Sequence, residues 1–315
     1  MEGITRRRNL NRKNSDADNF TQNNGDSGSG KDRRNSEEAE DSGPIVPYAP
    51  DLTLLEELFL LGLKDNAGHL SFWNDSISFV LRGCLLIELI LRNKLQFVKT
   101  QQNLNLPAPN RRIELINTEI TGEFLLDETI GLMKRSEPLS LTNWIAYLNG
   151  ETWNFSKLNY QLKQVRERIA KGLVEKGILR NDMKSYFLFE VSAYPMRDTQ
   201  PKKDLVKKLS TLLTQTPEKC LLALNHESPN QTPYLRLRTL LLAICATCAE
   251  VLDNIFDDYW ADQAINTGEN LLDQMSIYPL PKQCTKWLGI NQAVHMHYAP
   301  QLEMISTVLS ILKSS

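Results

Sequence analysis

Apolar residues follow one another almost without interruption in SFWNDSISFVLRGCLLIELILRNK, residues 71–94. A helix of this composition is apolar on nearly every side, so we expect it at the centre of a hydrophobic core. Asn74 or Asp75 is a candidate N-cap, and Trp73 comes just before them. Arg82 lies in the middle of the segment, where a guanidinium needs an anionic partner or a route to the surface.

The rest of the chain after Leu52 shows mostly helical spacing of apolar residues. Further helices are predicted in residues 53–65, 121–135, 139–150, 156–179, 201–215 and 235–256 and at the C-terminus. The segment 185–195, SYFLFEVSAYP, is rich in β-formers and ends in proline, which indicates a strand or hairpin. We therefore predict a mainly α fold, in which residues 49–315 form one globular helical domain with a central buried helix and a β-hairpin.

Residues 1–48 differ sharply from the rest, because they are rich in Asn, Ser, Asp, Gly and Arg and poor in large apolar side chains. Such a segment cannot bury enough surface to offset its ordering entropy, so we expect a disordered tail. The basic cluster Arg6, Arg7 and Arg8 is either a solubilising feature or a docking motif. The stretch GDSGSGKD, residues 25–32, resembles a P-loop, but Asp32 replaces the required Ser/Thr and no strand precedes it.

Composition narrows the function classes. The net charge of −2 does not favour a polycation that binds nucleic acid, so any anion must be met by a local patch. Five cysteines, and a start without an apolar run, predict reduced thiols in the cytosol. Cys245-Ala-Thr-Cys248 lies inside an apolar helical stretch, where core packing is favoured over redox or zinc chemistry. We expect no enzyme, no cofactor and no metal site.

Two cations on the predicted helix 156–179 are the clearest chemical feature. Lys163 and Arg166 are three residues apart, so on a continuous helix they share one flank. Such a pair can meet a doubly charged group such as a phosphate monoester, although a solvated face with Glu167 and Glu175 nearby is the plainer alternative. Arg82 likewise either pairs with a carboxylate from another helix or holds an anion at the surface.

Six blocks of sequence now point to one family. They are TLLEELFLLGLKDNAGHLSFWND, LRGCLLIELILR, TGEFLLDETI, GETWN, YQLKQVRERIAKGLVEKGIL and YFLFEVSAYP, in this order across residues 52 to about 198. With these blocks the chain resembles the Golgi phosphoprotein 3 family, in its fungal, vacuolar protein sorting branch. The resemblance implies a peripheral protein on the cytosolic face of the Golgi that binds phosphatidylinositol 4-phosphate.

The resemblance also implies specific residues. The head-group pocket of the family corresponds here to Trp73, Arg82, Lys163 and Arg166. Lys163 stands where some members carry arginine, which keeps the charge but loses the bidentate geometry.

Three further features come with the family. A hairpin at about residues 183–195, with Tyr186, Phe187, Leu188 and Phe189, is implied in membrane insertion or in self-association to a homo-oligomer. The N-terminal arginines Arg6, Arg7 and Arg8 are implied in binding the COPI coat. The family retains Golgi glycosyltransferases by binding their cytosolic tails. The alternative is a helical scaffold that binds proteins only and does not recognise a specific lipid.

Overall fold

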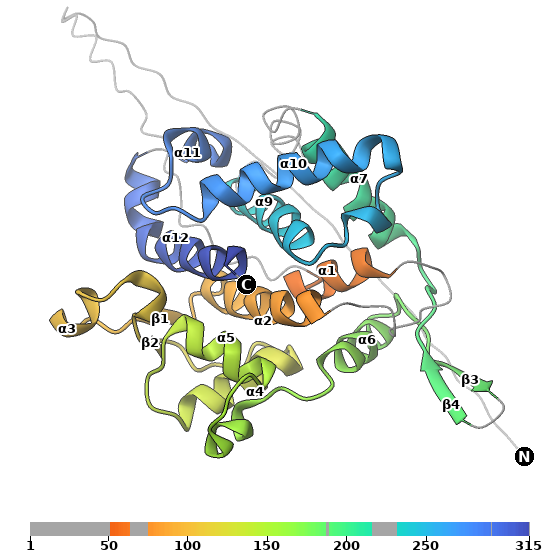
Figure 1. Cartoon of the computed structure of the whole chain (residues 1–315), viewed down its shortest axis with the longest axis horizontal. Helices are drawn as coiled ribbons and strands as arrows, with labels where there is room; N and C mark the ends of the chain where they lie inside the picture. Colours follow the sequence, from red (N-terminus) through yellow and green to blue (C-terminus); the bar gives the residue numbers. More distant parts are fainter. Residues whose placement is uncertain (1–50, 64–74, 187–188, 216–231, 291, 315) are drawn as a thin grey trace, which may run out of the picture. The chain divides into compact units, whose positions relative to one another are not determined.

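The fold is described by a computed structural model for residues 51–63, 75–186, 189–215, 232–290 and 292–314. The chain divides into two compact units, Met1–Asp41 and Ser42–Ser315, and all described residues belong to the second. Its described elements are mostly helices, with two small antiparallel sheets (Figure 1). The predicted fold class is confirmed.

Helix α2, Asp75–Leu91, lies at the centre of this unit, and its residues 80–90 are all buried. It packs against α1, α5, α9 and α12, so a helix without a polar face is covered on its several sides (Figure 1). At Gly83 a Cβ atom would meet the side chain of Leu312 at 2.9 Å, so the glycine allows α12 to approach closely.

Helix α1, Leu54–Gly62, begins with a capping box. The Thr53 hydroxyl accepts a hydrogen bond from the Glu56 N–H, while the Glu56 carboxylate accepts one from the Thr53 N–H at 2.8 Å. The two reciprocal bonds satisfy N–H groups that a helix start leaves unpaired.

The remaining helices are α3 (Gln101–Leu104), α4 (Phe124–Lys134), α5 (Leu141–Asn149), α6 (Val165–Glu175), α7 (Gln200–Thr214), α9 (Thr232–Cys248), α10 (Asp258–Met275), α11 (Lys282–Leu288) and α12 (Gln292–Lys313). Of these, α4, α5, α7, α9 and α12 agree broadly with the predicted ranges, whereas α3, α10 and α11 were not predicted. Short 3-10 turns cover Ala108–Asn110, Phe155–Tyr160 and Leu252–Asn254. The N-cap of α5 is Ser140, whose hydroxyl accepts a hydrogen bond from the Asn143 N–H.

The predicted hairpin is present as strands β3, Asp182–Tyr186, and β4, Phe189–Ala193, which pair antiparallel. The hairpin extends from the helical body (Figure 1). A second pair, β1 (Leu95–Phe97) with β2 (Ile113–Leu115), was not predicted. Strands of three residues are too short to show the alternation on which strand prediction depends.

The predicted continuous helix over residues 156–179 is wrong in its first part. Helix α6 begins only at Val165, because Gln164 adopts a left-handed backbone with φ +52°. The preceding residues form a 3-10 turn that the Asn154 side chain caps. Leu158, expected in the buried stripe, is 37 % exposed as a result. Lys163 therefore lies before the helix and does not share a helical flank with Arg166.

Candidate functional site

The guanidinium of Arg82 is buried at the N-terminal part of α2, with a residue exposure of 6 %. It donates to three backbone carbonyls: Nη1 to Ser78 at 2.8 Å, Nη2 to Leu162 at 3.1 Å and Nε to Leu148 at 3.3 Å. These contacts tie α2 to the end of α5 and to the residue just before Lys163. They use three of the five N–H donors of the side chain.

Arg166, in the first turn of α6, approaches the same place. Its Nη2 and Nε atoms donate to the Ser78 hydroxyl at 2.6 and 3.2 Å. Arg82 and Arg166 thus converge on one residue, one on its carbonyl and the other on its side chain. Lys163 is exposed on the segment that leads from Leu162 into the helix.

The electrostatics of this pair favour an anion. Burial and the nearby positive charge of Arg166 lower the pKa of Arg82 to about 10, while Glu151 acts in the opposite direction. Among the described residues, no carboxylate lies within ion-pairing distance of Arg82. A phosphate has the negative charge and the acceptor oxygens to interact with both guanidinium groups.

The alternative prediction is that Arg82 pairs with a carboxylate from another helix. Within the described part of the chain, its hydrogen bonds go to backbone carbonyls instead. The buried carboxylate of its own helix, Glu88, belongs to a different cluster. Glu88 accepts from Arg238 at 2.9 Å, from Arg92 at 3.0 Å and from the Leu54 N–H at 3.0 Å. Burial alone would raise the pKa of Glu88, but the charges of Arg238 and Arg92 lower it below its usual value. Glu88 is therefore ionised, and the cluster is a charged anchor inside the core.

The structure does not place the side chains of the other candidate residues at this site. Trp73 and the basic cluster Arg6, Arg7 and Arg8 lie outside the described residues, as do Phe187 and Leu188. Tyr186 and Phe189 are backbone partners at the ends of β3 and β4. Their roles stay predictions.

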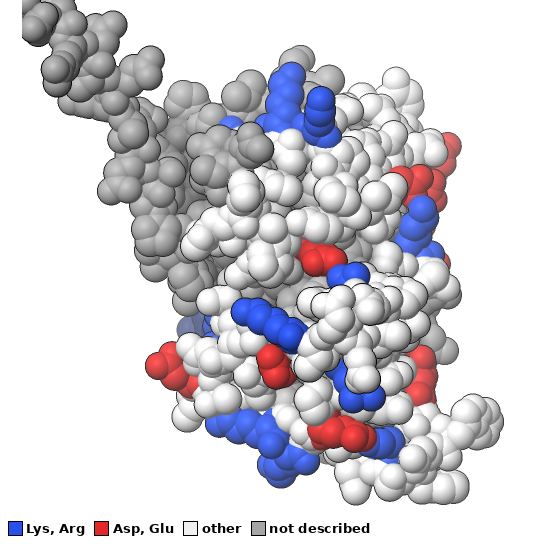
Figure 2. All heavy atoms as spheres, turned by 90° about the vertical axis from the view of Figure 1, so that its left-hand side faces the viewer, with Lys and Arg blue, Asp and Glu red and all other residues white. Residues whose placement is uncertain are grey.

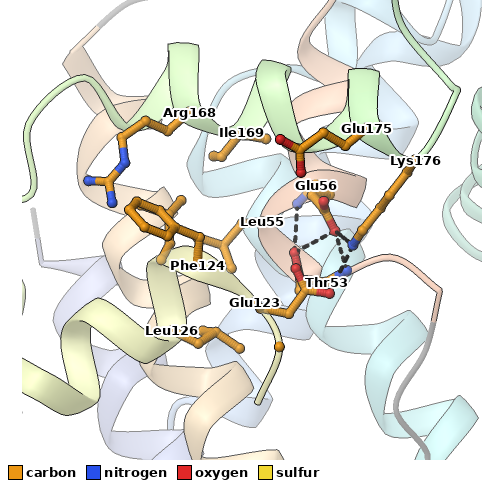
Figure 3. A pocket seen from close by; sticks show the side chains of 13 residues that line it. Thr53, Leu55, Glu56, Glu123, Phe124, Leu126, Arg168, Ile169, Glu175 and Lys176 are labelled. Carbon is orange, nitrogen blue, oxygen red and sulfur yellow. Dashed lines mark hydrogen bonds and ion pairs between the residues drawn. The ribbon is translucent and has the colours of Figure 1, made fainter. Parts of the chain in front are cut away.

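A second group of side chains, which sequence reasoning did not single out, lines a groove of about 150 Å³ between α1, α4 and α6 (Figure 3). Lys176 Nζ bridges Glu56 Oε2 at 2.7 Å and Glu123 Oε1 at 2.9 Å. Across the groove, the Arg168 guanidinium lies 4.4 Å from the centre of the Phe124 ring. Because one lysine joins carboxylates from two other elements, we interpret the three side chains as a clamp between α1, α4 and α6.

The cysteines do not form a reactive centre in the described part of the chain. Cys245 is fully buried, and a hydrogen bond with Cys84 together with burial raises its pKa well above the ordinary value. Burial raises the pKa of Cys248 to about 12 and that of Cys284 to about 11. The predicted core packing of Cys245 and Cys248 is confirmed. The described residues also hold no group of three or more His, Cys, Asp or Glu side chains placed to bind a metal.

The surface gives no sign of a large single-sign field on the face seen in Figure 2. Acidic and basic side chains are mixed there, on the side of α3, α11 and α12. Within the described ranges, no helix is both long and apolar enough to cross a membrane.

Comparison with known proteins gives a consistent result. The family model for Golgi phosphoprotein 3 (GPP34) matches residues 54–286, which include α2, α6 and the segment between α5 and α6. The chain is 44 % identical over 247 residues to vacuolar protein sorting-associated protein 74 of Eremothecium gossypii, covering 77 % of this chain and 74 % of that relative. It is 42 % identical over 270 residues to the protein of the same name from Schizosaccharomyces pombe, covering 84 % and 76 %.

Proposed function

Because the chain belongs to the Golgi phosphoprotein 3 family, we propose that it sorts Golgi proteins while bound to phosphatidylinositol 4-phosphate on the cytosolic face of the Golgi. Members of this family are sorting adaptors and not enzymes, in agreement with the prediction from sequence.

The observation that carries the lipid proposal is the convergence of Arg82 and Arg166 on Ser78. A phosphate monoester carries close to two negative charges at neutral pH and accepts several hydrogen bonds. It would interact with both guanidinium groups and use the N–H donors of Arg82 that the three carbonyls leave. We propose that Lys163 and Trp73 border the same head group, Lys163 as an exposed cation and Trp73 at the lipid interface.

Two partners and a role for the hairpin complete the proposal. The basic cluster Arg6, Arg7 and Arg8 binds the COPI coat, and the domain binds the cytosolic tails of Golgi glycosyltransferases, so that the adaptor links cargo to coat. The hairpin β3–β4 serves membrane insertion or self-association. Loss of coat capture in a variant with all three arginines replaced by alanine, at unchanged lipid binding, tests the first of these links.

The lipid proposal is tested by flotation with vesicles that contain phosphatidylinositol 4-phosphate, the 3-phosphate or plain phosphatidylinositol, adjusted to equal total charge. We expect wild type to float preferentially with the 4-phosphate and Arg166→Ala to lose this preference while staying folded. Lys171→Ala is the matched control, because this cation also lies on α6 but is exposed and pairs with Glu167. It should float like wild type.

Equal flotation of wild type with all three lipids, or with none, would contradict the proposal. The scaffold that binds proteins only would then take its place, with Arg82 as a purely structural anchor of the α5–α6 segment.

A further inference from the structure

The segment between α5 and α6 exposes two aromatic side chains that the head-group site does not use. Trp153 is fully exposed, at 101 %, and Phe155 is 86 % exposed. We propose that these two rings insert into the lipid surface beside the bound head group, so that residues 151–157 form a membrane-contacting loop. This inference rests on the proposed function, because the loop acts as the apolar partner of the head-group site.

The loop holds its shape without help from the rings. The Thr152 hydroxyl accepts from the Asn154 N–H at 3.1 Å, and Asn154 Oδ1 accepts from the Ser156 N–H at 3.0 Å and hydroxyl at 2.7 Å. Polar residues therefore alternate with Trp153 and Phe155 and satisfy the local backbone. A turn with internally satisfied N–H groups can approach an apolar phase at lower cost than one that depends on water.

The loop and the head-group site are parts of one structure. The segment between α5 and α6 is closed at its base by Leu148 and Leu162, since the Leu162 N–H donates to the Leu148 carbonyl at 3.1 Å. Arg82 donates to the carbonyls of both residues. Lys163 and Arg166 follow directly on the returning side. A head group held by these cations would place the membrane surface close to the loop.

A lipid surface fits this loop better than a protein partner does. Two protruding rings separated by short polar residues offer no concave or flat patch of the kind that a complementary protein face needs. Lys157 lies within the loop, with Nζ 5.3 Å from the centre of the Tyr160 ring and 3.5 Å from Glu137 Oε1, an ion-pair partner that is itself exposed. Aromatic rings next to cations are typical of elements that bind at anionic membrane interfaces, and two modest membrane signals together give stable attachment.

The test compares a Trp153→Ala, Phe155→Ala double variant with a Tyr259→Ala, Ile277→Ala control, whose side chains are exposed on and just after α10. The first assay is flotation with vesicles that contain phosphatidylinositol 4-phosphate. The second is binding of a water-soluble, short-chain form of the same lipid, which reports on the head-group site without a membrane. The third is quenching of tryptophan fluorescence by vesicles with brominated acyl chains, in wild type and in Trp153→Phe.

We expect the loop variant to lose vesicle affinity by about tenfold for each ring, since burying a large aromatic side chain is worth roughly that factor or more. Its affinity for the soluble lipid and the flotation of the control should not change. Wild type should be quenched by brominated chains, and Trp153→Phe should be quenched less.

Three results would overturn the inference: unchanged vesicle affinity of the loop variant, equal quenching of wild type and Trp153→Phe, or a change in oligomeric state instead of lipid binding. The last would assign the rings to a second copy of the chain. If wild type itself fails to bind the soluble lipid, the head-group proposal fails, and quenching by anionic vesicles without phosphoinositide still decides whether the loop inserts.

Discussion

Replacing Arg82 with alanine should destabilise the domain as well as remove lipid binding. The guanidinium makes three hydrogen bonds to backbone carbonyls, two of which lie 66 and 80 residues away in sequence. At a net value of about 1 kcal/mol each, their loss lowers the free energy of unfolding by about 3 kcal/mol. For a domain of this size, that corresponds to a fall in Tm of about 6–12 °C.

The effect of Arg166→Ala on stability should be smaller, about 1 kcal/mol, because Arg166 is only half-buried and its hydrogen bonds to the Ser78 hydroxyl lie at a half-buried position. Arg82→Lys is the informative intermediate, since an ammonium keeps the charge but cannot span three carbonyls with a planar fork. Urea unfolding followed by circular dichroism measures all three variants. If Arg82→Ala unfolds at the wild-type midpoint, the carbonyl contacts do not anchor the segment and the reasoning fails.

Three further predictions concern the rest of the domain. Arg238→Leu removes a cation that pairs with the buried Glu88 carboxylate, so the free energy of unfolding in urea titrations should fall by about 3–5 kcal/mol. A loss below about 1 kcal/mol would show that this ion pair does not anchor the core. Cys248 and Cys284 should react slowly with iodoacetamide at pH 8 in the folded protein and faster as pH rises, because raised pKa values keep the thiols protonated; peptide mass spectrometry would reveal rapid labelling if this is wrong. Gly150→Ala should cost about 1–2 kcal/mol of unfolding free energy, since φ is +89° at this helix end, and an unchanged urea midpoint would refute the strain.

Local sequence determined the elements whose pattern is long and self-consistent. The run of apolar residues around Arg82 is sufficient to predict a central helix, because a segment without a polar face is stable only when neighbours cover it. The β-rich segment before Pro195 likewise predicts the hairpin. Six ordered blocks carry the family resemblance, and the family match extends past them to residue 286.

The start of α6 shows where this reasoning stops. Apolar spacing alone continues the helix back to residue 156, whereas Gln164 takes a left-handed conformation and Asn154 caps a separate turn. The spacing of apolar residues indicates which side chains prefer burial. It does not indicate a break in the helix that contacts with other parts of the fold stabilise. Lys163 consequently lies off the helix.

The contacts of Arg82 were decided by tertiary structure alone. Its sequence neighbours show that a buried guanidinium needs partners, since an uncompensated buried charge is costly. They do not show that these partners are carbonyls from the end of α5 and the start of the α6 segment, or that Arg166 reaches the same Ser78. Hydrogen-bond partners so far apart in sequence depend on how the helices pack, and a pattern along the chain carries no information on that distance.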